Sequence, residues 1–375
     1  MASSPAARCR MSDPLAEIKR RLAAFAEKEA AGVSPLYEHL AAHAAEDDEI
    51  AGLLLAAPAA EDARAPLLFA TAHRLVQAEP IHPLSRYYPS LGGFDGVDAG
   101  TWPEFRGFLI ERVEKAKALI ASRYTQTNEV RRAALLYPAV ALAAKAAGGK
   151  VALLEAGCSA GLLLGMDTFG YRYQCGGDQL TAGPAKSAVG LHCALELAEG
   201  AVAPKLPKKL PVGAKLGLDR APVDAADEDE LAWLEACVWA DQPDRIRLLR
   251  TAAAAQRKNP PELVTGDLVD DLPAAVDRLP AELPLVLLTS HVVTYLPADK
   301  RAAFVDAVAG LGRPVWWVSQ EAYEVGIEPL LPGRDDLRFA DTGTSTLGLV
   351  EFGDGGPRAT ALARTAPHGQ RMTWL

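Results

Sequence analysis

The sequence predicts an α/β protein whose second part is a Rossmann-like, mostly parallel sheet and whose first third is helical. Three observations lead to this prediction. From Lys150 onward, short apolar runs alternate with helical patterns, as in chains built from strand–helix–strand units. The first of these runs ends in a glycine-rich turn. Before Lys150, apolar residues recur at helical spacing.

The expected helical domain covers residues 1–148. Asp13 and Pro14 are typical of a helix start, and helical patterns also cover residues 36–55, 66–77, 102–122 and 129–147. Residues 79–100 contain three prolines and four glycines, which indicates a loop. The glycine pair 148–149 predicts the end of the last helix.

The expected α/β domain covers residues 149–375. Its strands are predicted at residues 151–154, 171–175, 262–265, 285–289 and 315–318, with helices at 162–169 and 297–309. Residues 181–262 are predicted as a mixed insertion that is partly helical from Leu231 to Arg257. Two late strands, at 347–352 and 359–365, flank a glycine-rich turn and predict an antiparallel hairpin at the edge of the sheet.

The turn after the first strand has the pattern E-x-G-x-x-x-G, formed by Glu155, Gly157 and Gly161. Glycine lets the backbone turn tightly and lets a ligand approach without a Cβ in the way. Glu155 would repel the pyrophosphate of a dinucleotide, but it suits a cation. S-adenosylmethionine carries an ammonium and a sulfonium group and no phosphate, so the pattern favours this cofactor. Ser159 stands where the common methyltransferase pattern, acid-x-G-x-G-x-G, has its middle glycine.

Further polar residues are expected at the same edge of the sheet, where open α/β proteins bind their ligands. Asp178 follows the second predicted strand at the distance expected of an acid that binds ribose hydroxyls, and Asp267 follows the third. Ser290 and His291 follow the fourth strand, where Ser290 would contact the cofactor and His291 would act as a general base or orient a substrate. Glu321 follows the fifth and is expected to bind substrate. The alternative for each is an ordinary loop residue or a cap of the following turn.

Six stretches of the chain carry a resemblance to a known family. They are residues 82–90, 127–130, 154–162, 217–224, 237–239 and 290–297, which read HPLSRYYPS, TNEV, LEAGCSAGL, GLDRAPVD, CVW and SHVVTYLP. The chain resembles, from about Leu15 to the C-terminus, the bacterial family catalogued as domain of unknown function 2332. The resemblance implies a fold similar to that of class I methyltransferases, and Ser159 is usual within this family.

With this resemblance, the helical domain is expected to be a substrate lid with two chemically active segments. The loop at 79–100 holds four residues that are expected to bind substrate, because burial is not the obvious reason for so many polar rings. They are His82, Arg86, Tyr87 and Tyr88. At the start of the last helix, Asn128 is expected to bind substrate and Glu129 to be a second catalytic candidate. The alternative is that these residues cap the helix.

The composition restricts partners and location. The formal net charge is −9, and the lysines at 205–215 lack interleaved aromatic residues, so we expect no nucleic-acid partner. No apolar stretch approaches the length of a membrane span, and the N-terminal residues lack an apolar signal core, which predicts a cytoplasmic protein. Five cysteines without a C-x-x-C pair favour reduced thiols and no metal site.

These observations predict a cytoplasmic, S-adenosylmethionine-dependent methyltransferase that acts on a small molecule or a short peptide side chain. Two alternatives stay open. The same fold would bind a nucleoside-like ligand without methyl transfer, or the protein would be an NAD(P)-dependent oxidoreductase. Glu155 and the absent G-x-G-x-x-G pattern argue against the oxidoreductase.

Overall fold

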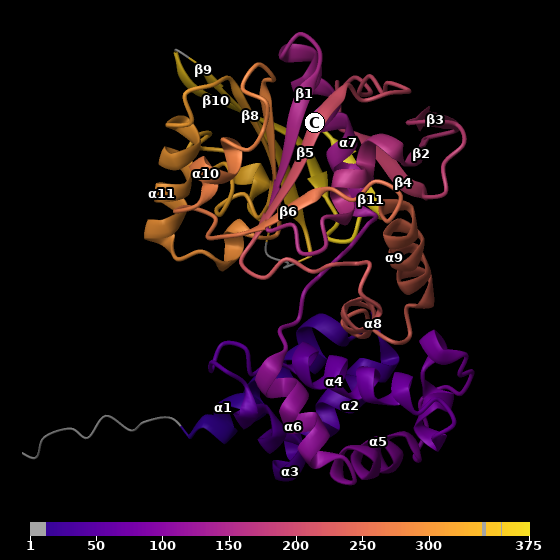
Figure 1. Ribbon diagram of the computed structural model, residues 1–375. Coiled ribbons are helices and arrows are strands. Elements are labelled where there is room, and N and C mark those ends of the chain that lie inside the picture. Colours follow the sequence, from indigo (N-terminus) through magenta and orange to yellow (C-terminus); the bar gives the residue numbers. More distant parts are fainter. Residues whose placement is uncertain (1–12, 340–342, 354) are drawn as a thin grey trace, which may run out of the picture. The chain divides into compact units, whose positions relative to one another are not determined.

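The computed structural model describes residues 13–339, 343–353 and 355–375, and the chain divides into two compact units (Figure 1). One unit comprises the chain as far as Thr127 together with Leu231–Ile246. The other comprises Asn128–Glu230 and Arg247–Leu375. Cys9, one of the five cysteines predicted to be reduced, and Asp354, in the predicted hairpin turn, lie outside the described residues.

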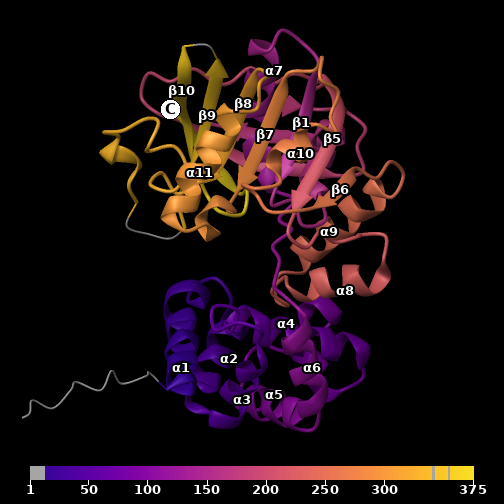
Figure 2. The same ribbon diagram turned by 60° about the vertical axis from the view of Figure 1, so that its left-hand side comes forward.

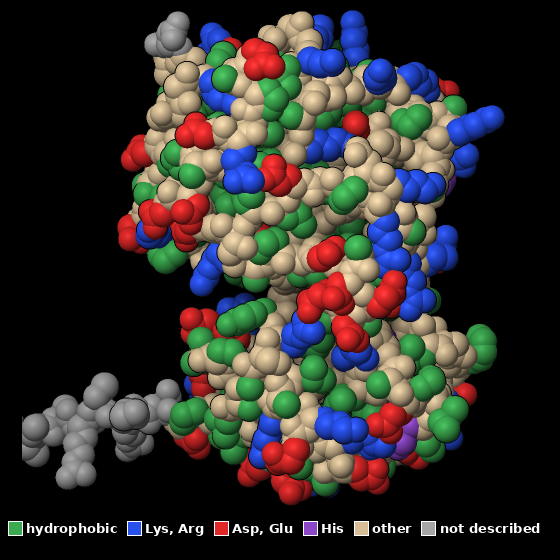
Figure 3. Space-filling view, viewed as in Figure 1, with side chains coloured by type: hydrophobic (Ala, Val, Ile, Leu, Met, Phe, Trp, Pro, Cys, Tyr) green, Lys and Arg blue, Asp and Glu red, His purple; other side chains and the backbone are tan. Residues whose placement is uncertain are grey.

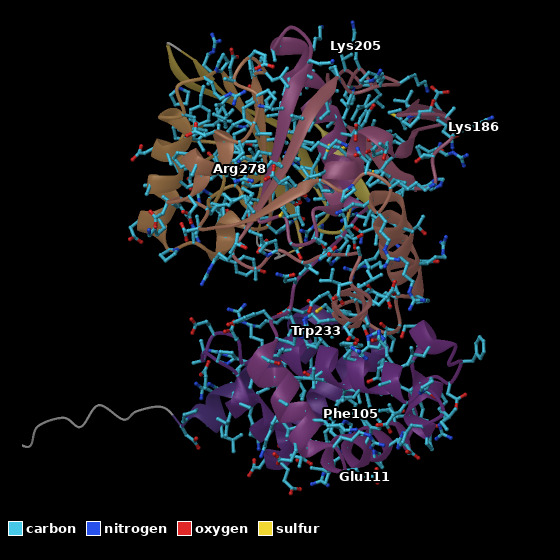
Figure 4. All side chains as sticks on the ribbon, viewed as in Figure 1. Phe105, Glu111, Lys186, Lys205, Trp233 and Arg278 are labelled. Carbon is cyan, nitrogen blue, oxygen red and sulfur yellow. The ribbon has the colours of Figure 1, made fainter. Side chains whose placement is uncertain are left out.

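The first unit is helical. Its elements are α1 (Pro14–Phe25), a π-helical turn (Ala26–Ala30), α2 (Pro35–Glu46), α3 (Asp48–Gly52), a 3-10 turn (Leu53–Ala56), α4 (Ala65–Ala78), α5 (Thr101–Ile110), α6 (Val113–Ser122) and most of α8 (Glu228–Ala236). The predicted start of α1 is confirmed, because Asp13 Oδ1 accepts a hydrogen bond from the Leu15 backbone N–H at 3.0 Å. Phe105 points into this unit, whereas Glu111 lies on its surface (Figure 4).

The loop at 79–100 is present, with two 3-10 turns at Pro83–Tyr87 and Pro89–Leu91, but its tyrosines are not exposed. Tyr87 and Tyr88 are 2% and 1% exposed and belong to the core of the helical unit, so burial does account for both rings. The Tyr87 hydroxyl donates to Asp98 Oδ1 at 2.7 Å and accepts from Arg86 Nη2 at 2.6 Å.

His82 also has a local structural contact. Its Nδ1 accepts from the Leu84 backbone N–H at 3.1 Å and so caps the first 3-10 turn. Its ring packs edge-on against Phe108 with 4.7 Å between the centroids. A substrate contact for the four predicted loop residues stays a prediction.

Replacing Tyr87 by phenylalanine removes the hydroxyl that joins Asp98 to Arg86. We expect the free energy of unfolding to fall by about 1–2 kcal/mol, because a hydrogen bond to a charged partner is lost while the ring stays in the core. Urea unfolding measures the change. Tyr124→Phe is the matched control, since Tyr124 is 50% exposed, and it is expected to leave the midpoint unchanged. Equal midpoints for both variants would contradict the prediction.

The second unit is built on one sheet, which has eleven strands among the described residues (Figures 1 and 2). The strands are β1 (Val151–Ala156), β2 (Gly170–Cys175), β3 (Asp178–Ala182), β4 (Gly190–Leu197), β5 (Val212–Asp219), β6 (Glu262–Thr265), β7 (Leu285–Ser290), β8 (Val315–Glu321), β9 (Ser345–Gly353), β10 (Gly356–Thr365) and β11 (Arg371–Trp374). Their order is β3-β2-β4-β11-β10-β9-β8-β7-β1-β5-β6. The predicted α/β class with a mostly parallel sheet is confirmed. Strands β9 and β10 form the predicted antiparallel hairpin, but its predicted place at the edge of the sheet is wrong, because β11 pairs with β10 and β8 pairs with β9 on its two sides.

Helices cover both faces of the sheet. On one face, α7 (Arg132–Ala146) contacts β4, β7, β8 and β9. On the other, α10 (Leu272–Val276) and α11 (Ala298–Ala309) share an apolar core with the strands (Figure 2). A further helix, α9 (Pro243–Gln256), precedes β6, and a 3-10 helix at Leu162–Thr168 follows β1. Strand β1 is buried along its whole length, and its sequence is accordingly apolar except for Glu155, its penultimate residue.

Residues 181–262 differ from the predicted insertion, because they supply β4 and β5 and the end of β3. Strand β5 pairs with β1 in the middle of the parallel region. Its apolar run is interrupted by Gly213, Lys215 and Gly217, and for this reason the sequence pattern does not predict a strand here. A Cβ on Gly217 would lie 2.6 Å from the Cys158 sulfur, so only glycine allows the turn after β1 to approach β5 this closely.

The direction of β2 decides where Asp178 lies. Six strands separate β2 from β1, and the pairs β8–β9, β9–β10 and β10–β11 are antiparallel. Because β11, β4 and β2 are mutually parallel, β2 runs opposite to β1. The turn from β2 to β3, where Asp178 pairs with Cys175, therefore lies at the other edge of the sheet.

Basic side chains gather over the part of the sheet unit that holds β2, β3 and β4 (Figure 3). Lys208 has a partner within the chain, because its Nζ donates to the carbonyl of Thr181 in β3 at 3.0 Å. Lys186 and Lys205 point outward (Figure 4). Within the described ranges, no helix has the length and apolar character that crossing a membrane requires.

Candidate active site at the carboxyl edge of the sheet

The parallel strands create a topological switch point between β1 and β7. Numbered along the chain, the five parallel strands β6, β5, β1, β7 and β8 have the order 3-2-1-4-5. Open sheets of this kind bind ligands outside the carboxyl ends of the strands, where the order reverses. The structure brings to this edge the predicted residues Asn128, Glu129, Glu155, Gly157, Ser159, Gly161, Asp267, Ser290, His291 and Glu321. It adds Asp219 and Arg132, which the sequence patterns missed, and it does not bring Asp178 there.

The turn 157–161 uses all five of its backbone N–H groups within the chain. The Leu218 carbonyl accepts the first two at 2.7 and 3.3 Å, and the Cys158 carbonyl accepts the last at 2.7 Å. Two side chains accept the others. The Ser159 N–H donates to Asp219 Oδ2 at 2.7 Å, and the Ala160 N–H donates to Asn128 Oδ1 at 3.3 Å. Unused N–H groups at such a turn are what binds a phosphate. This turn is therefore not arranged for one.

Backbone strain is concentrated on both sides of the switch point. Among the described residues, Ser159 and His291 are the only ones other than glycine with positive φ, at 49° and 54°. They follow β1 and β7, and strain of this kind is typical of functional sites. Asn128 Nδ2 donates to Ser159 Oγ at 2.9 Å and so fixes the serine that replaces glycine in this turn.

Three acids lie at the carboxyl ends of the neighbouring strands β1, β5 and β6: Glu155 within β1, Asp219 at the end of β5, and Asp267 just after β6. Glu155 is 5% exposed, and its Oε2 has no hydrogen-bond partner among the described residues. Burial raises the pKa of Glu155 well above its usual range and Asp219 raises it further, whereas Arg132 lowers it. Asp267 is partly exposed, and the Val269 N–H that donates to its Oδ1 at 2.8 Å is the main reason for a lowered pKa. The edge beside the turn is therefore rich in acidic side chains.

Arg132 connects the ends of several strands. It is the first residue of α7 and is 7% exposed. Its Nε donates to the Pro367 carbonyl at 2.9 Å, in the turn between β10 and β11, and its Nη1 donates to the Ser290 carbonyl at 3.3 Å. Ser290 Oγ in turn donates to Gln320 Oε1 at 2.8 Å. The side chain assigned to cofactor binding thus already belongs to a hydrogen-bond network.

His291 is held in its neutral form. Burial, with a smaller effect of Arg132, lowers its pKa to about 3. Its Nε2 lies 3.3 Å from Ser345 Oγ, and its backbone N–H donates to the Gln320 carbonyl at 3.0 Å. A histidine with so low a pKa is a weak general base at neutral pH. The low pKa argues against a general base, and a substrate contact of His291 stays a prediction.

Glu129 is buried and contacts its own helix start. Its Oε1 accepts from the Arg131 backbone N–H at 3.1 Å, and its Oε2 lies 3.7 Å from His368 Nδ1. The first contact is of the capping kind that the sequence leaves as the alternative, and the second links the helix start to the turn between β10 and β11. A catalytic role for Glu129 stays a prediction.

Glu321 is buried behind the segment that follows β7. It is 1% exposed, and its Oε1 accepts from the backbone N–H groups of Val292 and Val293 at 2.9 and 3.1 Å. Burial raises its pKa to about 7, against the effect of these N–H groups. In the described part of the chain, no cluster of three or more His, Cys, Asp or Glu side chains is suited to hold a metal ion.

Comparison with known proteins gives one family and weak structural similarities. Residues 19–374 match the family described as "Uncharacterized protein conserved in bacteria (DUF2332)". No curated protein matches the chain.

Three solved structures show the extent of the structural similarity. The chain is similar to WbdD in complex with the kinase inhibitor LY294002, with a TM-score of 0.25, 13% identity, and coverage of 51% of this chain and 30% of that one. For the sugar N-methyltransferase KedS8 from Streptoalloteichus, the TM-score is 0.24, the identity 12%, and the coverage 63% and 71%. CalS10 is an amino pentose methyltransferase from Micromonospora echinaspora solved with S-adenosylmethionine. Its TM-score is 0.23 and its identity 13%, and the similarity covers 63% of this chain and 75% of CalS10. The chain spans less than a third of WbdD.

Proposed function

The chain belongs to the bacterial family catalogued as domain of unknown function 2332, and from that premise we propose that it is a methyltransferase that uses S-adenosylmethionine and acts on a small molecule. One observation carries the proposal. At the switch point every backbone N–H of the turn 157–161 is satisfied within the chain, whereas acids lie at the carboxyl ends of β1, β5 and β6. Such an edge suits a cationic nucleoside and does not suit a pyrophosphate.

The residues at this edge fit S-adenosylmethionine. Asp219 and Asp267 are partly exposed carboxylates at the ends of β5 and β6, and they would accept hydrogen bonds from ribose hydroxyls and the adenine amine. Glu155, whose Oε2 is buried and has no partner among the described residues, would balance the positive charge of the ligand. When bound, this cofactor supplies an electrophilic methyl group.

The remaining side chains would position the acceptor. Methyl transfer is an in-line displacement, so most of the rate would come from orientation of the two reactants. His291 is neutral, and its Nε2 lies 3.3 Å from Ser345 Oγ, which fixes the ring. It would offer its other ring nitrogen as a hydrogen-bond partner. Asn128 and Ser159, which bond to each other at 2.9 Å, would keep the turn in place.

Calorimetry of the purified chain with S-adenosylmethionine, its demethylated product and NAD tests the proposal. We expect the first two to bind and NAD not to bind, because the turn has no unused N–H groups for a pyrophosphate. Binding of NAD alone would favour the oxidoreductase. Binding of none of the three would refute a cofactor site at this edge.

Binding of S-adenosylmethionine is also expected to release a proton and to become stronger as the pH rises. Burial raises the pKa of Glu155 in the free protein, and a cation beside the carboxylate would lower that pKa again. The ligand therefore favours the ionised form, and affinity falls as the pH drops below the raised pKa of the free protein. Titrations in buffers of different ionisation enthalpy count the protons. Glu155→Gln should bind weakly and release none, and an unaltered proton count in this variant would contradict the assignment.

A further inference from the structure

Val292 packs against the glycine-rich turn at the switch point in this structure. A Cβ built on Gly157 would lie 2.2 Å from Val292 Cγ2 and 2.7 Å from Val292 Cβ, so the valine side chain rests directly on the glycine backbone. The crevice between the first and fourth parallel strands is where ligands bind in open sheets of this order. The segment 291–296, which carries Val292, therefore covers the place that the proposed cofactor needs.

One carboxylate holds this segment against the sheet. Glu321 Oε1 accepts the backbone N–H groups of Val292 at 2.9 Å and Val293 at 3.1 Å. The other oxygen, Oε2, is buried and has no hydrogen-bond partner among the described residues. The segment begins at His291, whose φ of 54° is strained for a residue other than glycine. Glu321 thus supplies the acceptor for two backbone amides of the segment, and the closed segment includes a conformation that costs energy.

The structure also provides room for the segment to move. A cavity of about 380 Å³ adjoins it at Val293, and its walls include Phe304 of α11, Trp317 of β8 and Gly326. Beyond Val293 the segment is exposed to solvent, and Tyr295 is 72% exposed. Val293 is buried in the apolar core and lines this cavity, so a shift of the segment would have unfilled space beside it at Val293.

We propose that residues 291–296 form a gate over the switch-point crevice and that Glu321 is the positioning residue that keeps this gate closed. The proposal rests on the proposed function, because it assigns to the crevice the cofactor that Val292 now excludes. Opening would break the two hydrogen bonds to Glu321 and relieve the positive φ of His291. Val293 would move toward the neighbouring cavity. The ligand would bind to the open form and shift the population toward it.

Hydrogen exchange of the full chain tests the role of Glu321 without any ligand. In Glu321→Ala the amides of Val292 and Val293 lose their acceptor, so we expect the peptide covering 291–296 to exchange at least about tenfold faster. Peptides from β1 and β5 should keep their rates. Glu321→Gln retains an acceptor oxygen and should restore slow exchange. Unchanged exchange in the alanine variant, or a glutamine variant that exchanges as fast, would overturn the proposal.

Stopped-flow binding of S-adenosylmethionine tests the gate itself. Val292→Ala removes the side chain from the crevice, and we expect the association rate constant to rise by about tenfold, with a similar rise for Glu321→Ala. Val202→Ala is the matched control, because Val202 is 82% exposed, and its rate should equal that of the parent chain. Association rates that do not change in the first two variants would overturn the gate. If no variant and no parent chain binds the cofactor, the proposed function fails, and hydrogen exchange alone decides the role of Glu321.

Discussion

Replacing Asp219 by asparagine is expected to weaken the binding of S-adenosylmethionine by about 100-fold. Asp219 ends β5, the strand beside β1, and its two oxygens accept the backbone N–H groups of Ser159 at 2.7 Å and Ala221 at 2.8 Å. Asparagine has one acceptor oxygen, so it would turn an amide N–H₂ toward one of these donors. The variant would lose a charged acceptor for the ribose and disturb the turn that holds the ligand. Calorimetry of the two chains gives the ratio of dissociation constants.

Asp178→Asn is the matched variant for this experiment. The sequence distance assigns the ribose contact to Asp178, whereas the strand order places that residue at the opposite edge of the sheet. We therefore expect Asp178→Asn to bind as the parent chain does. Weaker binding in Asp178→Asn together with normal binding in Asp219→Asn would show that the ligand does not occupy the switch point.

Replacing Arg132 by methionine is expected to lower the free energy of unfolding by about 3–5 kcal/mol. Methionine keeps an apolar stem but leaves the carbonyls of Pro367 and Ser290 without their donor. It also removes the positive charge that lowers the pKa of the buried Glu155 and Glu321. Both carboxyls would then take up protons more readily, which would weaken any site that needs their charge.

Urea unfolding followed by circular dichroism measures this loss. Arg172→Met is the control, since Arg172 is an exposed residue of β2, and it should change the stability by less than about 0.5 kcal/mol. If Arg132→Met unfolds at the same urea concentration as the control, the network at the carboxyl edge does not contribute to stability as its geometry indicates.

Local patterns in the sequence predict the local structure well. The apolar runs of β1, β7 and β8 and the glycine-rich turn after β1 are recognisable because burial on both faces leaves few polar residues within such strands. The hairpin of β9 and β10 is recognisable from its turn. In these cases the residues that carry the sequence pattern are the same few neighbouring residues that form the strand or turn.

The order of strands in the sheet is not encoded in such local patterns. Asp178 and Asp219 both end or follow strands after β1, and only the pairing of β5 with β1 distinguishes them. The segment containing β2, β3 and β4 runs to the far side of the sheet before the chain returns as β5. Arg132 gives no signal either, because its partners are backbone carbonyls at residues far away in the sequence. For Tyr87 and Tyr88, the composition of the loop predicts exposed rings, whereas tertiary packing buries both of them.

Because the turn 157–161 is completed by hydrogen bonds from its own chain, it is preorganised. A ligand that binds there would not have to order these five residues, and little conformational entropy would be lost at this part of the site. The affinity of the turn would therefore come from its charge and shape, while any ordering or rearrangement on binding would be confined to neighbouring segments.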